Sequence, residues 1–301
     1  GLGIWGGQTY QVCTDANGFK SSCNDVSKSN RNFEIAFMGD SFTEAIGMKH
    51  EDSFVGMIAN DNPNLRIANL GVSFYSPSSY YSKINWLLEK GYSFKHIYVF
   101  IDISDIQDES IPTQHSIEAI ENKIVKNNDW HAQKQFVVKN FRIFHTGYRF
   151  VKCWLFAPKC VNNNIDVFTW DRSAWTSDEN ASGYGESGVT GSIEKALIKM
   201  NMLYELLRLN NIKLSVGVYP WPAQLLEIEN NPNGVNKQSQ IWKAFCEMKC
   251  EHFIDLFPRY NELVEINGVE KTYETYFIAG DVHYNREGNR LIYEQVNQTV
   301  R

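Results

Sequence analysis

The chain has 301 residues, 43% hydrophobic and 21% charged, which suits one large α/β domain or a domain that carries an insertion. Its formal net charge of −6, without any block of basic residues, argues against a nucleic acid or an anionic membrane surface as the main partner. No apolar run approaches the length of a membrane span.

Six cysteines fall into three local pairs, Cys13 with Cys23, Cys153 with Cys160, and Cys246 with Cys250. Short-loop disulfides are the simplest interpretation, and they imply an oxidising compartment. Reduced buried cysteines in a cytosolic protein remain an alternative, whereas a metal site is disfavoured because no cysteine pair has zinc-finger spacing with a matching histidine pair. The first residues resemble neither a signal peptide nor an initiator methionine. We therefore expect an extracytoplasmic protein, periplasmic or secreted, that follows a removed targeting or anchoring segment.

Residues 1–31 are polar and rich in Gly, Asn and Ser, so we predict an irregular N-terminal arm. The apolar run 33–38 predicts a buried strand, and Gly39-Asp40-Ser41 follows it as a tight polar turn. Such a turn lifts the Ser41 hydroxyl above the carboxyl end of a strand, where open α/β sheets place their ligands. The alternative is a structural turn in which the serine caps a helix.

Helical and extended patterns then alternate along the chain. Strands are predicted at 65–70, 97–101, 214–219 and 252–256, and helices at 51–60, 79–90, 192–210, 240–249 and 287–297. This alternation predicts an α/β fold with a doubly wound parallel sheet of about five strands and helices on both faces. The pattern blurs between about 108 and 190, which we interpret as an insertion into a domain spanning 32–301, with helices of its own, one of them at 135–156.

A nucleophilic serine needs a base within hydrogen-bond reach and a group that orients that base. Asp281 and His283 lie in a polar loop before the last predicted helix, and a doubly wound sheet brings that loop to the edge where Ser41 lies. Taken alone, each could equally be an ordinary loop residue. Candidate oxyanion donors are the backbone N–H groups of Ser41 and Gly71 and the side chain of Ser104.

These residues together resemble the SGNH, or GDSL, hydrolase superfamily. Its four sequence blocks match Gly39-Asp40-Ser41, then Gly71, then Asp102-Ile103-Ser104-Asp105, and finally Asp281 with His283. Ser104 stands where the family has an asparagine. The aspartate lies two residues before the histidine instead of three, as in the branch of alginate and related polysaccharide O-acetyltransferases and esterases. No Gly-x-Ser-x-Gly elbow of the α/β-hydrolases occurs.

The resemblance implies a flavodoxin-like SGNH fold and an acyl-enzyme on Ser41, with His283 as base and then acid and Asp281 fixing its tautomer. It also implies activity on an acetylated glycan, as an O-acetyl esterase or acyltransferase that needs no cofactor and no metal. Tyr75 and Trp221 are candidates for stacking on a sugar, although both could be core residues. The alternatives are a GDSL lipase or thioesterase, and a catalytically weak carbohydrate-binding protein of the same fold.

Overall fold

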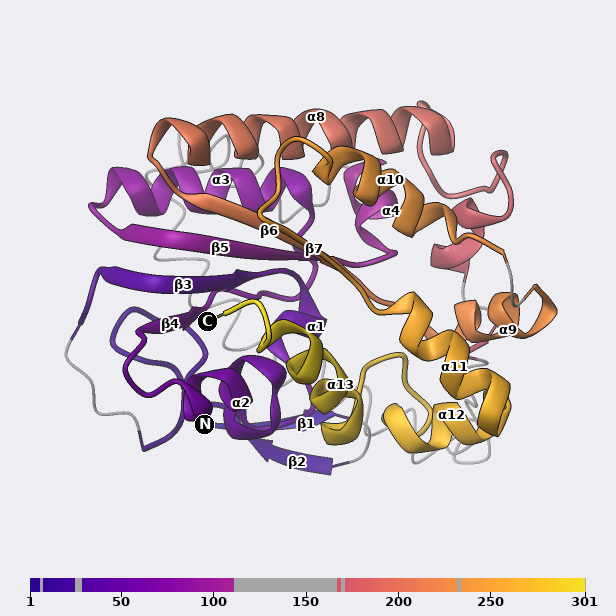
Figure 1. Ribbon diagram of the computed structural model, residues 1–301, viewed down its shortest axis with the longest axis horizontal. Coiled ribbons are helices and arrows are strands. Elements are labelled where there is room, and N and C mark those ends of the chain that lie inside the picture. The colour runs from indigo at the N-terminus through magenta and orange to yellow at the C-terminus, as the bar shows by residue number, and fades with distance from the viewer. Residues whose placement is uncertain (6–7, 25–28, 111–166, 169–170, 232–233, 301) are drawn as a thin grey trace, which may run out of the picture. The chain divides into compact units, whose positions relative to one another are not determined.

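A parallel five-stranded sheet forms the centre of the fold in the computed structural model (Figure 1). Its strands, in the spatial order β4-β3-β5-β6-β7, are β4 (Ile67–Asn69), β3 (Asn32–Met38), β5 (Ser93–Ile101), β6 (Lys213–Val218) and β7 (His252–Asp255). All four neighbouring pairs run parallel. Each strand coincides with one of the predicted extended runs, so the predicted doubly wound α/β fold is confirmed.

The structure describes residues 1–5, 8–24, 29–110, 167–168, 171–231 and 234–300. All of these residues belong to one of the two compact units into which the chain divides, and the other unit spans 112–166. The helix predicted at 135–156 therefore lies outside the described residues.

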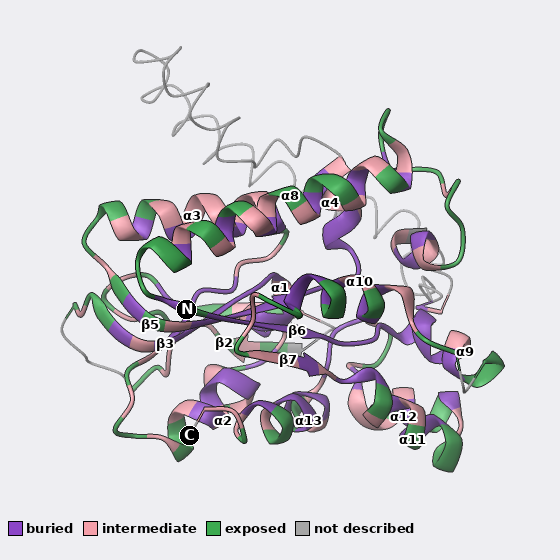
Figure 2. Ribbon diagram, turned by 45° about the horizontal axis from the view of Figure 1, so that its top comes forward, coloured by how far each residue is buried: buried purple, intermediate pink, exposed green. Residues whose placement is uncertain are grey.

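Helices cover both faces of the sheet. Figure 1 shows α3 (Pro77–Glu89), α8 (Gly188–Leu209) and α10 (Lys237–Cys246) on one face, and α2 (Phe54–Asp61) and α13 (Arg286–Val296) on the other. The buried residues of these helices lie on the sides that face the sheet (Figure 2). Because both faces are covered, the strands read as continuous apolar runs, and Ala36, Phe37 and Met38 of β3 are fully buried.

The remaining described helices connect these elements. They are α1 (Ser41–Glu44), η1 (His50–Asp52), α4 (Asp105–Ser110), η2 (Asp171–Thr176), α9 (Pro222–Asn230), α11 (Phe257–Asn267) and α12 (Val269–Tyr276).

The strand order places a topological switch point between β3 and β5. From β3 the chain moves outward to β4, and it then returns to the other side of β3 to form β5. The connections that follow β3 and β5 therefore leave the sheet in opposite directions, and in open α/β sheets ligands bind outside the carboxyl ends of the strands at such a point. Ser41 follows β3, and Asp102 follows β5.

Two parts of the chain differ from the sequence prediction. The arm is not irregular throughout, because β1 (Leu2–Trp5) and β2 (Gln8–Gln11) form an antiparallel hairpin. These strands are short and lack a clear alternation of apolar and polar residues. The expected insertion is also narrower than 108–190, since Trp175 and Tyr184 are buried in the core of the sheet unit.

Two of the three predicted disulfides are present, Cys13–Cys23 and Cys246–Cys250, and are thereby confirmed. Cys153 and Cys160 lie outside the described residues. Among the helices described, none combines the length and the apolar character that crossing a membrane requires.

Candidate active site

Ser41 is the first residue of helix α1, directly after strand β3. Asp40 is the N-cap of this helix, and its Oδ1 accepts a hydrogen bond from the backbone N–H of Phe42 at 2.9 Å. Ala45 ends the helix in the left-handed region, with φ of 57°. Because Asp40 supplies the cap, the Ser41 side chain is not needed for it and remains available for chemistry.

Ser41, His283 and Asp281 form a hydrogen-bonded chain. The Ser41 Oγ lies 2.8 Å from His283 Nε2, and His283 Nδ1 lies 2.5 Å from Asp281 Oδ1. An ionised carboxylate only accepts hydrogen bonds, so Nδ1 carries the proton in this arrangement and the neutral Nε2 accepts from the serine hydroxyl. The order of roles is that of a nucleophile, a base and the group that orients the base.

The spacing of two residues between Asp281 and His283 works because the carboxylate turns back along its own loop. Asp281 Oδ1 accepts the backbone N–H of His283 at 2.9 Å as well as the ring Nδ1. The loop is held in place by Tyr273 of α12, whose hydroxyl oxygen accepts the backbone N–H of Asp281 at 3.0 Å and lies 3.1 Å from the carbonyl oxygens of Ile278 and Asp281. One short turn thus fixes both members of the pair.

The protonation states suit this chain of contacts. Partial burial alone would raise the pKa of the Asp281 carboxyl, but the hydrogen bond and positive charge of His283 outweigh it, and the pKa lies below its usual range. Asp281 is therefore ionised at neutral pH and stabilises a protonated imidazole.

Aromatic rings hold the His283 imidazole on two sides. The Phe42 ring lies 4.6 Å from it, centroid to centroid, at an interplanar angle of 34°, and the Trp5 ring lies 5.5 Å from it at 85°. Only 8% of His283 is exposed. Trp5 comes from strand β1, so the N-terminal hairpin forms part of the site. The sequence analysis missed this role, because no motif links residue 5 to residue 283.

Lys20 connects the arm to the nucleophile turn. Its Nζ donates to the carbonyl oxygens of Ala45 and Met48 at 2.7 and 2.9 Å, just after α1. Burial lowers the pKa of this lysine to about 8, although the carboxylates of Glu44 and Glu51 oppose the shift. No motif predicts this buried contact either.

Gly71 lies against helix α1, but its backbone N–H has a partner within the protein. It donates to the side-chain oxygen of Asn69 at 3.0 Å, and the Asn69 amide donates to the carbonyl oxygen of Thr43. A Cβ at position 71 would clash with the backbone of Thr43 and Glu44. The glycine is therefore explained by close packing, and in this structure its N–H is not free for an oxyanion.

Ser104 is also engaged within the protein. It is buried, and its backbone N–H donates to Asp102 Oδ1 at 2.6 Å. A hydrogen bond from the Ser104 side chain opposes the rise that burial causes in the pKa of Asp102, and the role of this side chain as an oxyanion donor stays a prediction. The backbone N–H of Ser41 remains a candidate donor, because the first N–H groups of a helix have no acceptor within the helix.

Three buried carboxyls, Asp40, Asp102 and Asp105, lie behind the nucleophile with one oxygen of each within 4.8 Å of the others. Burial raises the pKa of all three, and the mutual repulsion of the carboxylates raises those of Asp40 and Asp105 further. Such raised values mean that the cluster retains protons at pH values where free carboxyls are ionised.

Most oxygens of this carboxyl cluster already face a hydrogen-bond donor. Asp102 Oδ2 accepts from the Trp221 indole, and Asp105 Oδ2 accepts from the Tyr80 hydroxyl at 2.7 Å. Asp105 Oδ1 is buried without a partner. This donor set fits protonated or shared carboxyls better than the ligand shell of a cation, which needs several free oxygens.

The two aromatic residues expected to stack on a sugar are placed differently from each other. Trp221 is only 3% exposed and donates to Asp102, so its ring lies in the core and that expectation is corrected. Tyr75 is half-buried, with the Nζ of Lys83 5.1 Å from its ring centroid.

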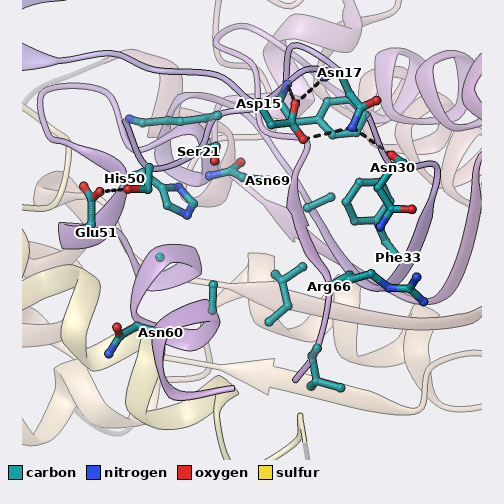
Figure 3. Close-up of a pocket in the computed structure, with 18 of the residues that line it drawn as sticks. Asp15, Asn17, Ser21, Asn30, Phe33, His50, Glu51, Asn60, Arg66 and Asn69 are labelled. Carbon is teal, nitrogen blue, oxygen red and sulfur yellow. Dashed lines mark hydrogen bonds between the residues drawn. The ribbon is translucent and has the colours of Figure 1, made fainter. Parts of the chain in front are cut away.

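A cavity of about 510 Å³ lies between the arm, strand β4 and helix α2 (Figure 3). The Asn17 amide donates to Asp15 and to the carbonyl oxygen of Asn30, so the polar groups of the arm are bonded to one another there. Neither Ser41 nor His283 lines this cavity. It is therefore separate from the hydrogen-bonded chain of Ser41, His283 and Asp281.

No protein-family model matches the sequence, and no curated protein matches it. Among solved structures, the acetyl xylan esterase AlAXEase superimposes with a TM-score of 0.52 at 14% identity, over 89% of this chain and 100% of that chain. The chain shares the fold of this acetyl xylan esterase. The likeness concerns the fold alone.

Two other solved structures are less similar. A catalytic mutant of the acetylxylan esterase Axe2 from Geobacillus stearothermophilus gives a TM-score of 0.49 at 10% identity, over 89% of this chain and 94% of that one. A lipolytic protein of the G-D-S-L family from Desulfitobacterium hafniense DCB-2, described as putative, gives 0.46 at 11% identity, over 89% and 99%.

Proposed function

We propose that this protein is a serine esterase that cleaves O-acetyl or other short O-acyl groups from a carbohydrate. One observation carries the proposal, the unbroken chain of hydrogen bonds from Asp281 through His283 to Ser41. The esterase fold and the position of Ser41 at a topological switch point support it.

In this mechanism Ser41 Oγ attacks the ester carbonyl while His283 Nε2 accepts its proton. Asp281, ionised and bonded to Nδ1, stabilises the imidazolium that forms. The backbone N–H of Ser41 contributes to stabilising the oxyanion. His283 then returns the proton to the leaving sugar hydroxyl, which leaves an acyl group on Ser41.

The acceptor in the second half-reaction decides between two activities. If water accepts the acyl group, the protein is an esterase, and if a second sugar hydroxyl accepts it, the protein is an O-acetyltransferase. The Asp-x-His spacing resembles that of the branch that contains polysaccharide O-acetyltransferases. The two disulfides support a site of action in an oxidising, extracytoplasmic compartment.

The first test measures acetate release from a short-chain acetate ester and from acetylated xylo-oligosaccharides. We expect Ser41→Ala to abolish release from both, and a serine-reactive phosphonate to label Ser41 in the wild type. Ser177→Ala, which removes an exposed hydroxyl, is the matched control and should retain full activity.

Other outcomes would redirect the proposal. A preference for long-chain or thioester substrates would indicate the lipase or thioesterase alternative. Tight oligosaccharide binding without turnover of any ester would indicate a carbohydrate-binding protein.

A further inference from the structure

The loop between β4 and α3 lies directly against the nucleophile turn. The backbone N–H of Val72 donates to the carbonyl oxygen of Gly39 at 3.2 Å. The N–H and hydroxyl of Ser73 both donate to Glu44 Oε2, at 2.7 and 2.5 Å, and Glu44 lies in the same short helix as Ser41. These bonds fix the residue that follows, Phe74, beside the catalytic edge of the sheet.

Phe74 combines two features that a stable fold does not require. Its φ is 68°, in the left-handed region that favours glycine, and 65% of it is exposed. A bulky residue in this region costs on the order of 1–3 kcal/mol, and such outliers concentrate at functional sites. The other described non-glycine residues with positive φ are Ala45, which has a small side chain, and Asn211, a type that tolerates the region.

We propose that Phe74 is the platform on which the sugar ring of the substrate stacks. This inference rests on the proposed esterase function and names the part of the site that recognises the carbohydrate. The C–H face of a pyranose is apolar and matches the face of an exposed aromatic ring, whereas the sugar hydroxyls stay in contact with water. An aromatic residue on a loop that is fixed to the nucleophile helix positions the ester over Ser41.

The other aromatic candidates are less exposed than Phe74. Trp221 is in the core, and Tyr75 is half-buried beside the Lys83 ammonium. Phe74, by contrast, is 65% exposed, as a surface residue that contacts a ligand is.

The test compares a sugar ester with a small ester that offers nothing to stack. In Phe74→Gly, we expect the KM for acetylated xylo-oligosaccharide to rise about five- to ten-fold, which corresponds to the loss of one aromatic contact. The value of kcat/KM for vinyl acetate should stay at the wild-type level. The Tm should rise, because glycine relieves the backbone strain.

Three further variants sharpen the comparison. Asparagine tolerates positive φ but has no ring, so Phe74→Asn should raise the KM for the sugar ester as much as Phe74→Gly does. Phe74→Trp keeps an aromatic ring and should keep the low KM. Trp86→Ala removes a ring that is 52% exposed on helix α3, and it should change neither ester. If the KM for the sugar ester and the Tm both rise in Phe74→Gly, damage to the fold does not explain the weaker binding.

An unchanged KM for the sugar ester, or an equal loss with vinyl acetate, would overturn the role of Phe74 while the wild type remains an active esterase. A loss confined to long-chain acyl esters would also overturn it, since the ring would then contact the acyl group. Wild-type protein that cleaves neither ester would overturn the proposed function itself and the role of Phe74 with it.

Discussion

Asp281 shows how a carboxylate can orient a histidine from only two positions away. A single oxygen accepts both the backbone N–H and the ring Nδ1 of His283. The backbone bond holds the carboxylate in the position from which it contacts the ring. The two hydrogen bonds are local to the turn, whereas Tyr273, Phe42 and Trp5 hold the turn and the imidazole from other elements.

We expect Asp281→Asn to lower kcat by about 10⁴-fold, as loss of the orienting aspartate does in other serine triads. The neutral amide stabilises an imidazolium less than a carboxylate does, and its NH2 group can donate to Nδ1, which places the ring proton on Nε2 and leaves no base facing Ser41. Steady-state kinetics with a chromogenic acetate ester measure the change. Asp178→Asn, at an exposed position, should retain wild-type kcat. Near-normal kcat in Asp281→Asn would mean that another group orients the histidine.

At this scale the sequence predicted the residues that lie in recognisable local motifs. Ser41, Asp281 and His283 could be found because each follows or precedes a clear structural element. The roles of Gly71, Ser104 and Trp221 depend on which partner a buried N–H or ring meets across the sheet. Long-range contacts of this kind, such as that of Trp5 with His283, produce no pattern of apolar and polar residues from which they could be predicted.

At the scale of elements, the N-terminal arm supports the catalytic loops from outside the sheet. Strand β1 supplies Trp5 to the His283 ring, and Lys20 binds the carbonyl oxygens that follow α1. The Cys13–Cys23 disulfide closes a loop in the arm. Lys20 lies inside this loop, and Trp5 precedes it. A disulfide of this kind limits how far the arm can open.

Replacing both Cys13 and Cys23 by alanine should reduce kcat by about ten-fold or more, because the catalytic groups lose their outer support and small misplacements are costly in rate. The loss of a cross-link that spans 10 residues should also lower the free energy of unfolding, by about 2–3 kcal/mol. Kinetics and urea denaturation measure the two effects.

The matched control is the double alanine variant of Cys246 and Cys250, whose cross-link spans 4 residues at the end of α10. It should lose stability but keep kcat. If both double variants lose activity in proportion to stability, the arm has no specific role at the site.

The sheet could be predicted almost strand by strand, whereas the elements packed around its edge could not. Continuous apolar runs identify buried parallel strands. The β1–β2 hairpin has no such run. The polar neighbours of Trp175 predict an insertion, whereas its ring is fully buried and its Nε1 donates to the carbonyl oxygen of Ile103.

At the scale of the whole molecule, the buried carboxyls couple global stability to pH. Burial, with the neighbouring Asp40 and Asp102 carboxyls, holds the pKa of Asp105 well above its usual 3.8. The folded chain therefore binds more protons than the unfolded chain as pH rises above that value. Stability contributed by the protonated form is present at low pH and is lost as pH rises through the raised pKa.

We expect Asp105→Asn to reduce the loss of unfolding free energy as pH rises. The amide stays neutral, and its oxygen can still accept a hydrogen bond from the Tyr80 hydroxyl. The slope of unfolding free energy against pH should become shallower by up to about 1.4 kcal/mol per pH unit for the one proton removed. Urea denaturation between pH 5 and pH 8 measures it. Parallel curves for variant and wild type would show that Asp105 is already ionised in the folded protein.

The two ends of the Ser41–His283 hydrogen bond are 242 residues apart in the chain. At translation rates of about 5–20 residues per second, the serine precedes its base by roughly 12–50 s. During that interval the growing chain carries a serine hydroxyl without a base and cannot attack an ester. On the proposed mechanism, a chain that ends before His283 lacks the base and is inert.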